Sequence, residues 1–230
     1  MTCIIEDELY NKWSKKLYSL YTNIYNYNDV DNLDVGKSYS VFVTNREYSK
    51  KDLLKFVDVY NTDSDCPLEF DLLTLHYMYK PYINKKTASV LVFDLDDTII
   101  TDDGENITGN VDVNVLRKKY DKIILWTHGT QSHLKKNLDN IKQWNFDYML
   151  SRRQEYRGPK HLSQVLKFLN KKEKITNFTY TCLVDDYIEN YKNDYDIFIN
   201  IKNKMDFKDL SNLILKNTNK YINTSIFTKV

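Results

Sequence analysis

The sequence predicts an α/β protein whose carboxy-terminal part is a doubly wound parallel sheet, and three observations support this prediction. After Lys85, short apolar runs alternate with segments of helical periodicity, as in parallel strands joined by crossover helices. The runs are rich in β-branched residues, which is typical of strands buried on both faces. Two runs end abruptly in aspartates, Asp94 and Asp185, and unpaired charges are excluded from a sheet core. These acids should therefore lie past the carboxyl ends of strands, where open α/β sheets bind their ligands.

The individual elements follow from apolar runs and helical spacing. Helices should lie between the strands, and a final helix should begin near Asp206, which is a good capping residue. Gly104 lies in a turn after the first strand and predicts a small hairpin flap. The predicted strands are 89–93, 122–126, 147–150, 180–184 and 196–199, and the predicted helices are 111–120, 131–143, 160–170 and the segment through Leu210, Leu213 and Leu215.

The amino-terminal region has a different pattern, so a domain boundary is predicted near residue 85. Residues 1–85 read as a mainly helical extension, and residues 86–230 as the core domain with its carboxy-terminal helix. In the extension, apolar residues recur at helical spacing from Leu9 to Ile24, and one short strand is expected at 39–43. Two further helices are expected at 49–57 and 72–78. None of these segments carries a motif that indicates a function.

Composition excludes some classes of partner. The formal net charge is +1, so no overall field favours nucleic acid or a membrane. No apolar run has transmembrane length, and the acids from Glu6 to Glu8 interrupt any signal peptide. The three cysteines are an odd number without metal-type spacing. We therefore expect an intracellular protein in a reducing compartment, with no membrane partner.

Four features that can carry chemistry occur in chain order, each at a predicted strand end or helix start. Asp94 and Asp96 point to the same side of an extended chain, and acids this close repel unless a cation or a proton relieves them. This favours a divalent metal and phosphate chemistry. Each feature alone also fits helix capping or a solvated lysine, so the prediction depends on their conjunction. The features are Asp94-Leu95-Asp96-Asp97-Thr98, Thr127 after an apolar strand, Lys160 at a helix start, and Asp185-Asp186.

This arrangement resembles the haloacid dehalogenase (HAD) superfamily of aspartate-nucleophile phosphatases, and the resemblance covers roughly residues 89–203. It implies that Asp94 is the nucleophile, which attacks phosphorus and forms an aspartyl-phosphate. It also implies that Asp96 is the general acid and base, which protonates the leaving oxygen and later activates water. Thr98 is expected to brace the loop rather than to contact substrate.

The same resemblance implies a cofactor and a phosphate site. Mg²⁺ would be held by Asp94, Asp185 and the backbone carbonyl of Asp96, with Asp186 as a further ligand, direct or through water. Thr127 would donate a hydrogen bond to a phosphoryl oxygen. Lys160 would neutralise both the phosphate and the aspartates.

The intervals between the motifs predict a capless enzyme. Neither 98–123 nor 127–160 has room for the folded cap that many members of this superfamily carry. Without a lid that excludes water, specificity must come from a large partner over the open crevice. A phosphoprotein or a nucleic-acid end is therefore favoured over a sugar phosphate.

Local detail narrows the resemblance further. Lys160-His161-Leu162-Ser163 is similar to a segment of the small carboxy-terminal-domain phosphatases (the FCP/SCP-like branch), although Asp97 and Asp186 depart from that branch's usual residues. The run Leu125-Trp126-Thr127-His128-Gly129 resembles the second motif of the viral nucleocapsid-assembly phosphatases of baculoviruses and nudiviruses, the 38K type. That second resemblance implies dephosphorylation of a viral DNA-packaging or capsid protein in the nucleus.

The expected function is thus that of a Mg²⁺-dependent phosphoric monoester hydrolase acting on phosphoserine or phosphothreonine protein. Two alternatives stay open. One is a nucleic-acid 3′-phosphatase, which the basic run between Arg152 and Lys174 would suit. The other is a non-enzymatic assembly scaffold that retains the fold.

Overall fold

The structure is a computed structural model of the chain. The chain divides into two compact units, one comprising Met1–Thr87 with His161–Phe178 and the other Ala88–Lys160 with Thr179–Val230. The predicted domain boundary at residue 85 stays a prediction. The described residues are 2–7, 9–10, 23–32, 40–44, 46, 48, 53, 56, 58–61, 86–101, 104–105, 111–151, 160–187, 194–201 and 210–227.

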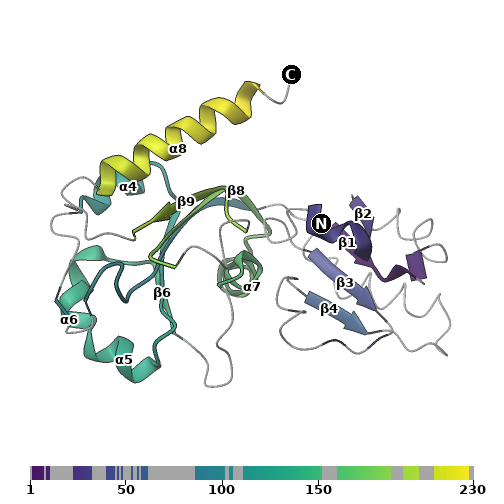
Figure 1. The fold of residues 1–230 in the computed structure, drawn as a ribbon, viewed down its shortest axis with the longest axis horizontal. Coiled ribbons are helices and arrows are strands. Elements are labelled where there is room, and N and C mark those ends of the chain that lie inside the picture. Colours follow the sequence, from purple (N-terminus) through teal and green to yellow (C-terminus); the bar gives the residue numbers. More distant parts are fainter. Residues whose placement is uncertain are drawn as a thin grey trace. The chain divides into compact units, whose positions relative to one another are not determined.

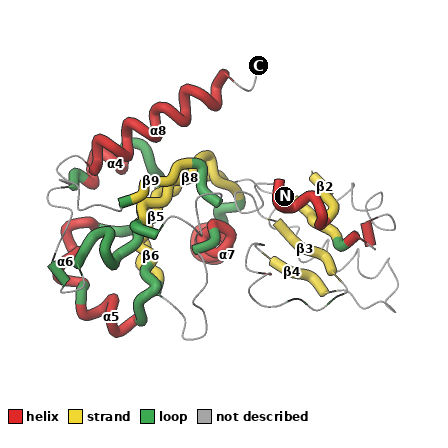
Figure 2. Tube along the Cα trace, viewed as in Figure 1, coloured by secondary structure: helices red, strands yellow, loops and turns green. Residues whose placement is uncertain are grey.

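The larger sheet has the strand order β7-β6-β5-β8-β9. Figure 1 labels its strands β6, β8 and β9, and Figure 2 also labels β5. The pairings of β5 with β6, β6 with β7, and β8 with β9 are parallel. The chain moves from β5 to one edge of the sheet and then returns to the other side of β5, so the strand order reverses there. Such a switch point is where open parallel sheets bind ligands. The strands are β5 (Thr87–Phe93), β6 (Lys122–Trp126), β7 (Tyr148–Leu150), β8 (Asn177–Asp185) and β9 (Ile197–Asn200).

Helices α4, α5, α6 and α8 share one hydrophobic core with this sheet. Alternate strand residues such as Leu91 and Phe93 line the core, as the two-residue period of a strand requires. Their neighbours Val90 and Val92 are also fully buried, so β5 is apolar on both faces. The helices are α4 (Val113–Arg117), α5 (Gln131–Lys136), α6 (Leu138–Ile141) and α8 (Leu210–Phe227), and a 3-10 helix, η3 (Lys142–Trp144), follows α6.

The predicted α/β class with parallel strands is confirmed, and all five strands after Lys85 lie where they were expected. The one long helix predicted at 131–143 is wrong in detail, because it is broken at Asn137. The Asn137 side chain donates a hydrogen bond to the carbonyl oxygen of His133, at 3.1 Å. Side-chain bonds of this kind compete with the helical backbone. The predicted cap Asp206 lies outside the described residues.

The first unit contains a second parallel sheet, with strand order β2-β1-β3-β4. The strand expected at 39–43 is confirmed as β3, but the other three strands were not predicted. Ile24, predicted at the end of a helical stripe, lies in β2 instead. Asp7, Leu9 and Tyr10 are helical, while most of the helices predicted before residue 85 lie outside the described residues. The strands are β1 (Thr2–Ile5), β2 (Asn23–Asn26), β3 (Ser40–Thr44) and β4 (Asp58–Asn61), and a 3-10 helix, η1 (Tyr27–Asn32), follows β2.

The amino-terminal sheet carries its own small core, in which Phe42 stacks on Phe56 with ring centroids 4.5 Å apart. At the end of β1, buried Glu6 accepts hydrogen bonds from the hydroxyl groups of Thr44, at 2.8 Å, and Tyr48, at 2.6 Å. Helix α7 (Leu162–Glu173) also belongs to the first unit. No described helix is both long enough and apolar enough to cross a membrane.

Candidate active site

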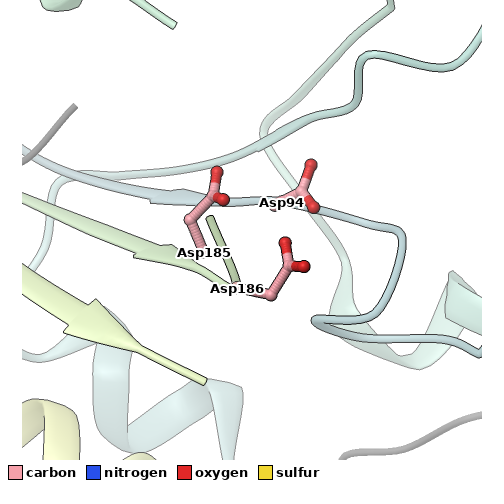
Figure 3. Close-up of side chains that lie close together, drawn as sticks. All are labelled: Asp94, Asp185 and Asp186. Atoms are coloured by element: carbon pink, nitrogen blue, oxygen red, sulfur yellow. The ribbon is translucent and has the colours of Figure 1, made fainter. Parts of the chain in front are cut away.

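Three aspartates lie together at the switch point of the larger sheet (Figure 3). Asp94 directly follows β5, and its backbone N–H donates to the carbonyl oxygen of Val184, at 2.9 Å. Asp185 is the last residue of β8, and Asp186 follows it. Because β5 and β8 are neighbours in the sheet, two apolar strands far apart in sequence deliver their acids to one place. Asp94 and Asp185 are 6% and 1% exposed, so these carboxylates are held out of water.

Lys160 supplies a buried positive charge to this cluster. Its side chain is 1% exposed, and Nζ donates to Asp185 Oδ2 at 2.8 Å and also to Asp94 Oδ1. The hydroxyl group of Tyr195 donates to the carbonyl oxygen of Lys160, at 3.1 Å, and so anchors the backbone there. A lysine is rarely buried to this degree unless its charge is paired, so these contacts explain its position.

The charges of this cluster do not balance. Burial raises the pKa of Asp94 to about 7, against the lowering effect of Lys160 and with a further rise from Asp185. Burial lowers the pKa of Lys160, but the two carboxylates outweigh this effect and the net direction is upward. Burial and the charge of Asp185 also raise the pKa of Asp186. When all four groups are ionised, three carboxylates and one ammonium group leave two negative charges uncompensated.

The cluster fits a hard divalent cation. Each aspartate offers one oxygen, and these three oxygens lie within 4.8 Å of one another. Two oxygens that bind one Mg²⁺ at about 2.1 Å are about 4.2 Å apart on opposite sides of the ion and about 3 Å apart at neighbouring positions of its octahedron. A separation near the 4.8 Å limit would therefore have to shrink by roughly 0.6–1.8 Å on binding. Ca²⁺, with distances of about 2.3–2.6 Å, would need less closure. The all-oxygen ligands and the excess charge suit either ion.

Thr98 and Asp97 shape the loop that carries the first motif. Thr98 is fully buried, its hydroxyl group accepts from the N–H of Asp186 at 3.1 Å, and it lies 3.5 Å from Asp94 Oδ2. It thus links the two acidic strand ends, as expected for a residue that braces the loop. Asp97 has φ of 54°, in the left-handed region that Asp tolerates better than most residues. Its N–H donates to the carbonyl oxygen of Ile100, at 2.8 Å, which closes the turn.

Asp96 lies apart from the three clustered acids and has its own partners. Thr127 donates its hydroxyl proton to Asp96 Oδ2 at 2.9 Å, and His133 Nε2 lies 2.6 Å from Asp96 Oδ1. The N–H of Gly129 in turn donates to the Thr127 hydroxyl oxygen at 2.7 Å. In this structure the Thr127 hydroxyl proton is therefore bonded to Asp96, and donation to a phosphoryl oxygen would require that bond to be exchanged.

The predicted site residues thus form two groups. The first contains Asp94, Lys160, Asp185 and Asp186, and the second contains Asp96 and Thr127. Sequence reasoning missed His133 as a partner of Asp96. One signal for it exists, since Thr130 is a helix N-cap that follows a strand end, and His133 lies in the first turn of that helix. The arginines at 152, 153 and 157 lie outside the described residues.

The chain was compared with known protein families. The family described as "Protein of unknown function (DUF705)" matches residues 70–155, which is less than half of the chain. The matched segment contains Asp94, Asp96, Thr127 and His133, but it ends before Lys160 and Asp185. No curated protein gives a significant match to the chain.

Proposed function

We propose that this protein is a Mg²⁺-dependent phosphatase of the capless HAD type, which acts through an aspartyl-phosphate on a phosphoserine or phosphothreonine protein. The observation that carries the proposal is the junction of buried Asp94, Lys160 and Asp185 at the switch point, beside a separately held Asp96. The resemblance of the four motifs to the HAD superfamily supports the same reading. On this proposal, four segments of one unit supply the nucleophile, its counter-charge, the metal ligands and the acid/base.

In the proposed reaction, an oxygen of Asp94 attacks phosphorus while the bond from phosphorus to the ester oxygen breaks. The leaving oxygen takes a proton from the carboxylic acid of Asp96. Water then attacks the phosphorus of the aspartyl-phosphate and gives a proton to Asp96, while the bond to Asp94 breaks and releases inorganic phosphate. Lys160 stabilises negative charge on the phosphoryl oxygens.

The metal site of this proposal comprises Asp94, Asp185, the backbone carbonyl of Asp96, and Asp186. When bound there, Mg²⁺ would offset the excess negative charge and favour the approach of an anionic phosphate. Oxygen ligands from carboxylates and carbonyls are those that Mg²⁺ prefers.

The substrate class follows from the absence of a predicted cap. Between β5 and β6 the described residues form the turn around Gly104 and helix α4, and between β6 and β7 they form α5, α6 and η3. A macromolecular substrate would then cover the crevice. The resemblance to the 38K type extends this proposal to a viral DNA-packaging or capsid protein as substrate, and to action in the nucleus.

The test is phosphate release by the full-length protein from a phosphoserine peptide and from a 3′-phosphorylated oligonucleotide, with Mg²⁺ and with EDTA. We expect the peptide to be the better substrate, with activity lost in EDTA and in Asp94→Asn. Asp97→Asn is the matched control, because Asp97 is exposed and Asn tolerates its positive φ equally well. Full activity in Asp94→Asn would refute the nucleophile. A preference for the oligonucleotide would indicate the 3′-phosphatase, and an inactive wild-type protein would indicate the scaffold.

A further inference from the structure

We infer that His133 is a positioning residue that fixes the carboxyl group of Asp96 for proton transfer, an inference that rests on the proposed phosphatase function. His133 Nε2 lies 2.6 Å from Asp96 Oδ1, and the two residues are 37 positions apart in sequence. Thr127 occupies the other oxygen, Oδ2, at 2.9 Å. An ionised carboxylate only accepts hydrogen bonds, so Nε2 carries the proton in that state.

Two contacts, one on each oxygen, define the orientation of the Asp96 carboxyl group. The Asp96 side chain is 34% exposed and that of His133 is 37% exposed, so packing alone does not immobilise either of them. A single contact would still let the carboxyl group rotate about its last bond. General acid catalysis requires the donor oxygen to stay within hydrogen-bonding reach of the leaving group. The geometry thus assigns to His133 the role of preventing rotation of the Asp96 carboxyl group about its last side-chain bond.

The local chain is built to bring the imidazole to this position. Thr130 caps α5, and its hydroxyl group accepts from the N–H of His133 at 3.2 Å, which fixes the helix start. Gly129 leaves room for the ring, because a Cβ atom at this position would lie 2.5 Å from His133 Cδ2 and 3.0 Å from Thr127 Oγ1. A methyl group at residue 129 would therefore displace both partners of Asp96. The contacts of Asp96 with His133 and Thr127 thus depend on the absence of a side chain at residue 129.

The test compares His133→Leu with His133→Gln in steady-state hydrolysis of p-nitrophenyl phosphate and phenyl phosphate with Mg²⁺. Glutamine can place a donor near the position of Nε2, whereas leucine cannot. We expect kcat/KM for phenyl phosphate to fall roughly 10- to 100-fold in His133→Leu, which is below the full contribution of about 10²–10⁴-fold typical of a general acid because Asp96 itself is kept. The loss should be smaller for p-nitrophenyl phosphate, whose leaving group needs little protonation. His133→Gln should recover most of the loss, and KM should stay within about twofold in both variants.

Gly129→Ala provides a second, independent route to the same defect. Gly129→Ala should reproduce the leaving-group dependence of His133→Leu. The double variant that combines the two should lose no more kcat/KM than the more impaired single variant, because both substitutions act on one contact. Circular dichroism establishes that each variant is folded.

Three results would overturn the inference while leaving the phosphatase proposal intact. They are wild-type kinetics in His133→Leu, equal losses in the leucine and glutamine variants, and equal losses on the two esters. A wild-type protein that hydrolyses neither of these esters nor the phosphoserine peptide in Mg²⁺ would instead overturn the phosphatase proposal, and the role of His133 with it.

Discussion

Replacing Lys160 with methionine tests whether the acidic cluster depends on one buried cation. Lys160 is 1% exposed, and its ammonium group contacts both Asp94 and Asp185, the latter at 2.8 Å. Methionine keeps a long unbranched side chain but removes the charge, so two buried carboxylates lose the ammonium group that they share. Removing one partner of a buried ion pair costs about 3–5 kcal/mol, because the remaining charge is left without compensation.

We expect a loss of this size in the free energy of unfolding of Lys160→Met at pH 7 without divalent metal. For a chain of this length, it corresponds to a fall in Tm of roughly 6–20 °C. Urea unfolding followed by tryptophan fluorescence is a suitable assay, because Trp126 and Trp144 belong to the same unit as the site. Lys167→Met is the matched control. The Lys167 side chain is 61% exposed and lies 3.6 Å from Asp58, and exposed pairs contribute only about 0–1 kcal/mol.

A double variant separates charge balance from lost packing. Adding Asp94→Asn to Lys160→Met removes one of the uncompensated charges, so the double variant should be at least about 1 kcal/mol more stable than additivity predicts. The reasoning is refuted if Lys160→Met lies within about 1 kcal/mol of wild type. It is equally refuted if the two substitutions are additive.

Three further predictions concern stability. Burial raises the pKa of Asp94 to about 7 from an ordinary value of 3.8. The contribution of Asp94 to the free energy of unfolding is therefore full below about pH 4 and is lost as the pH rises through 7. Without metal, Asp94→Asn should show a smaller decline in urea midpoint between about pH 5 and 8 than wild type. Tyr120→Phe should cost about 1–2 kcal/mol, because the Tyr120 hydroxyl group lies 2.6 Å from that of Thr218 in the core, and an unchanged urea midpoint would contradict this. Glu6→Leu should lower the free energy of unfolding by roughly 2–4 kcal/mol, measured by thermal circular dichroism, because the hydroxyl groups of Thr44 and Tyr48 lose their common acceptor. A loss under about 1 kcal/mol would show that the hydrogen bonds of Glu6 do not stabilise the fold.

The strands of the larger sheet could be predicted because each is a short apolar run with polar residues at its ends. β6 was predicted to the residue, whereas β8 begins three residues earlier than expected, since Asn177-Phe178-Thr179 alternates polar and apolar residues. The amino-terminal sheet could not be predicted in the same way. β1 and β2 have four residues each, and strands this short are fixed by pairing between distant segments, which local periodicity does not reveal.

The site residues also divide into those that a local sequence pattern predicts and those that depend on contacts between distant segments. Asp94, Asp96 and Asp185 could be predicted because charges at the ends of buried strands have few structural explanations. The contact between His133 and Asp96 could not, because it depends on where the first turn of α5 meets a loop 37 residues earlier in the chain. The break at Asn137 was also hidden, because it arises from a bond between that side chain and the His133 carbonyl group.

The different exposure of the two aspartates in the first motif matches the different tasks proposed for them. The side chain of Asp94 is 9% exposed and paired with a buried ammonium group, whereas that of Asp96 is 34% exposed. A nucleophile benefits from a dry site, where fixed charges stabilise the transition state more strongly than water does. An acid/base that must deliver a proton and then receive one from water needs access to solvent. Two acids that are only two residues apart in the chain thus lie in two environments.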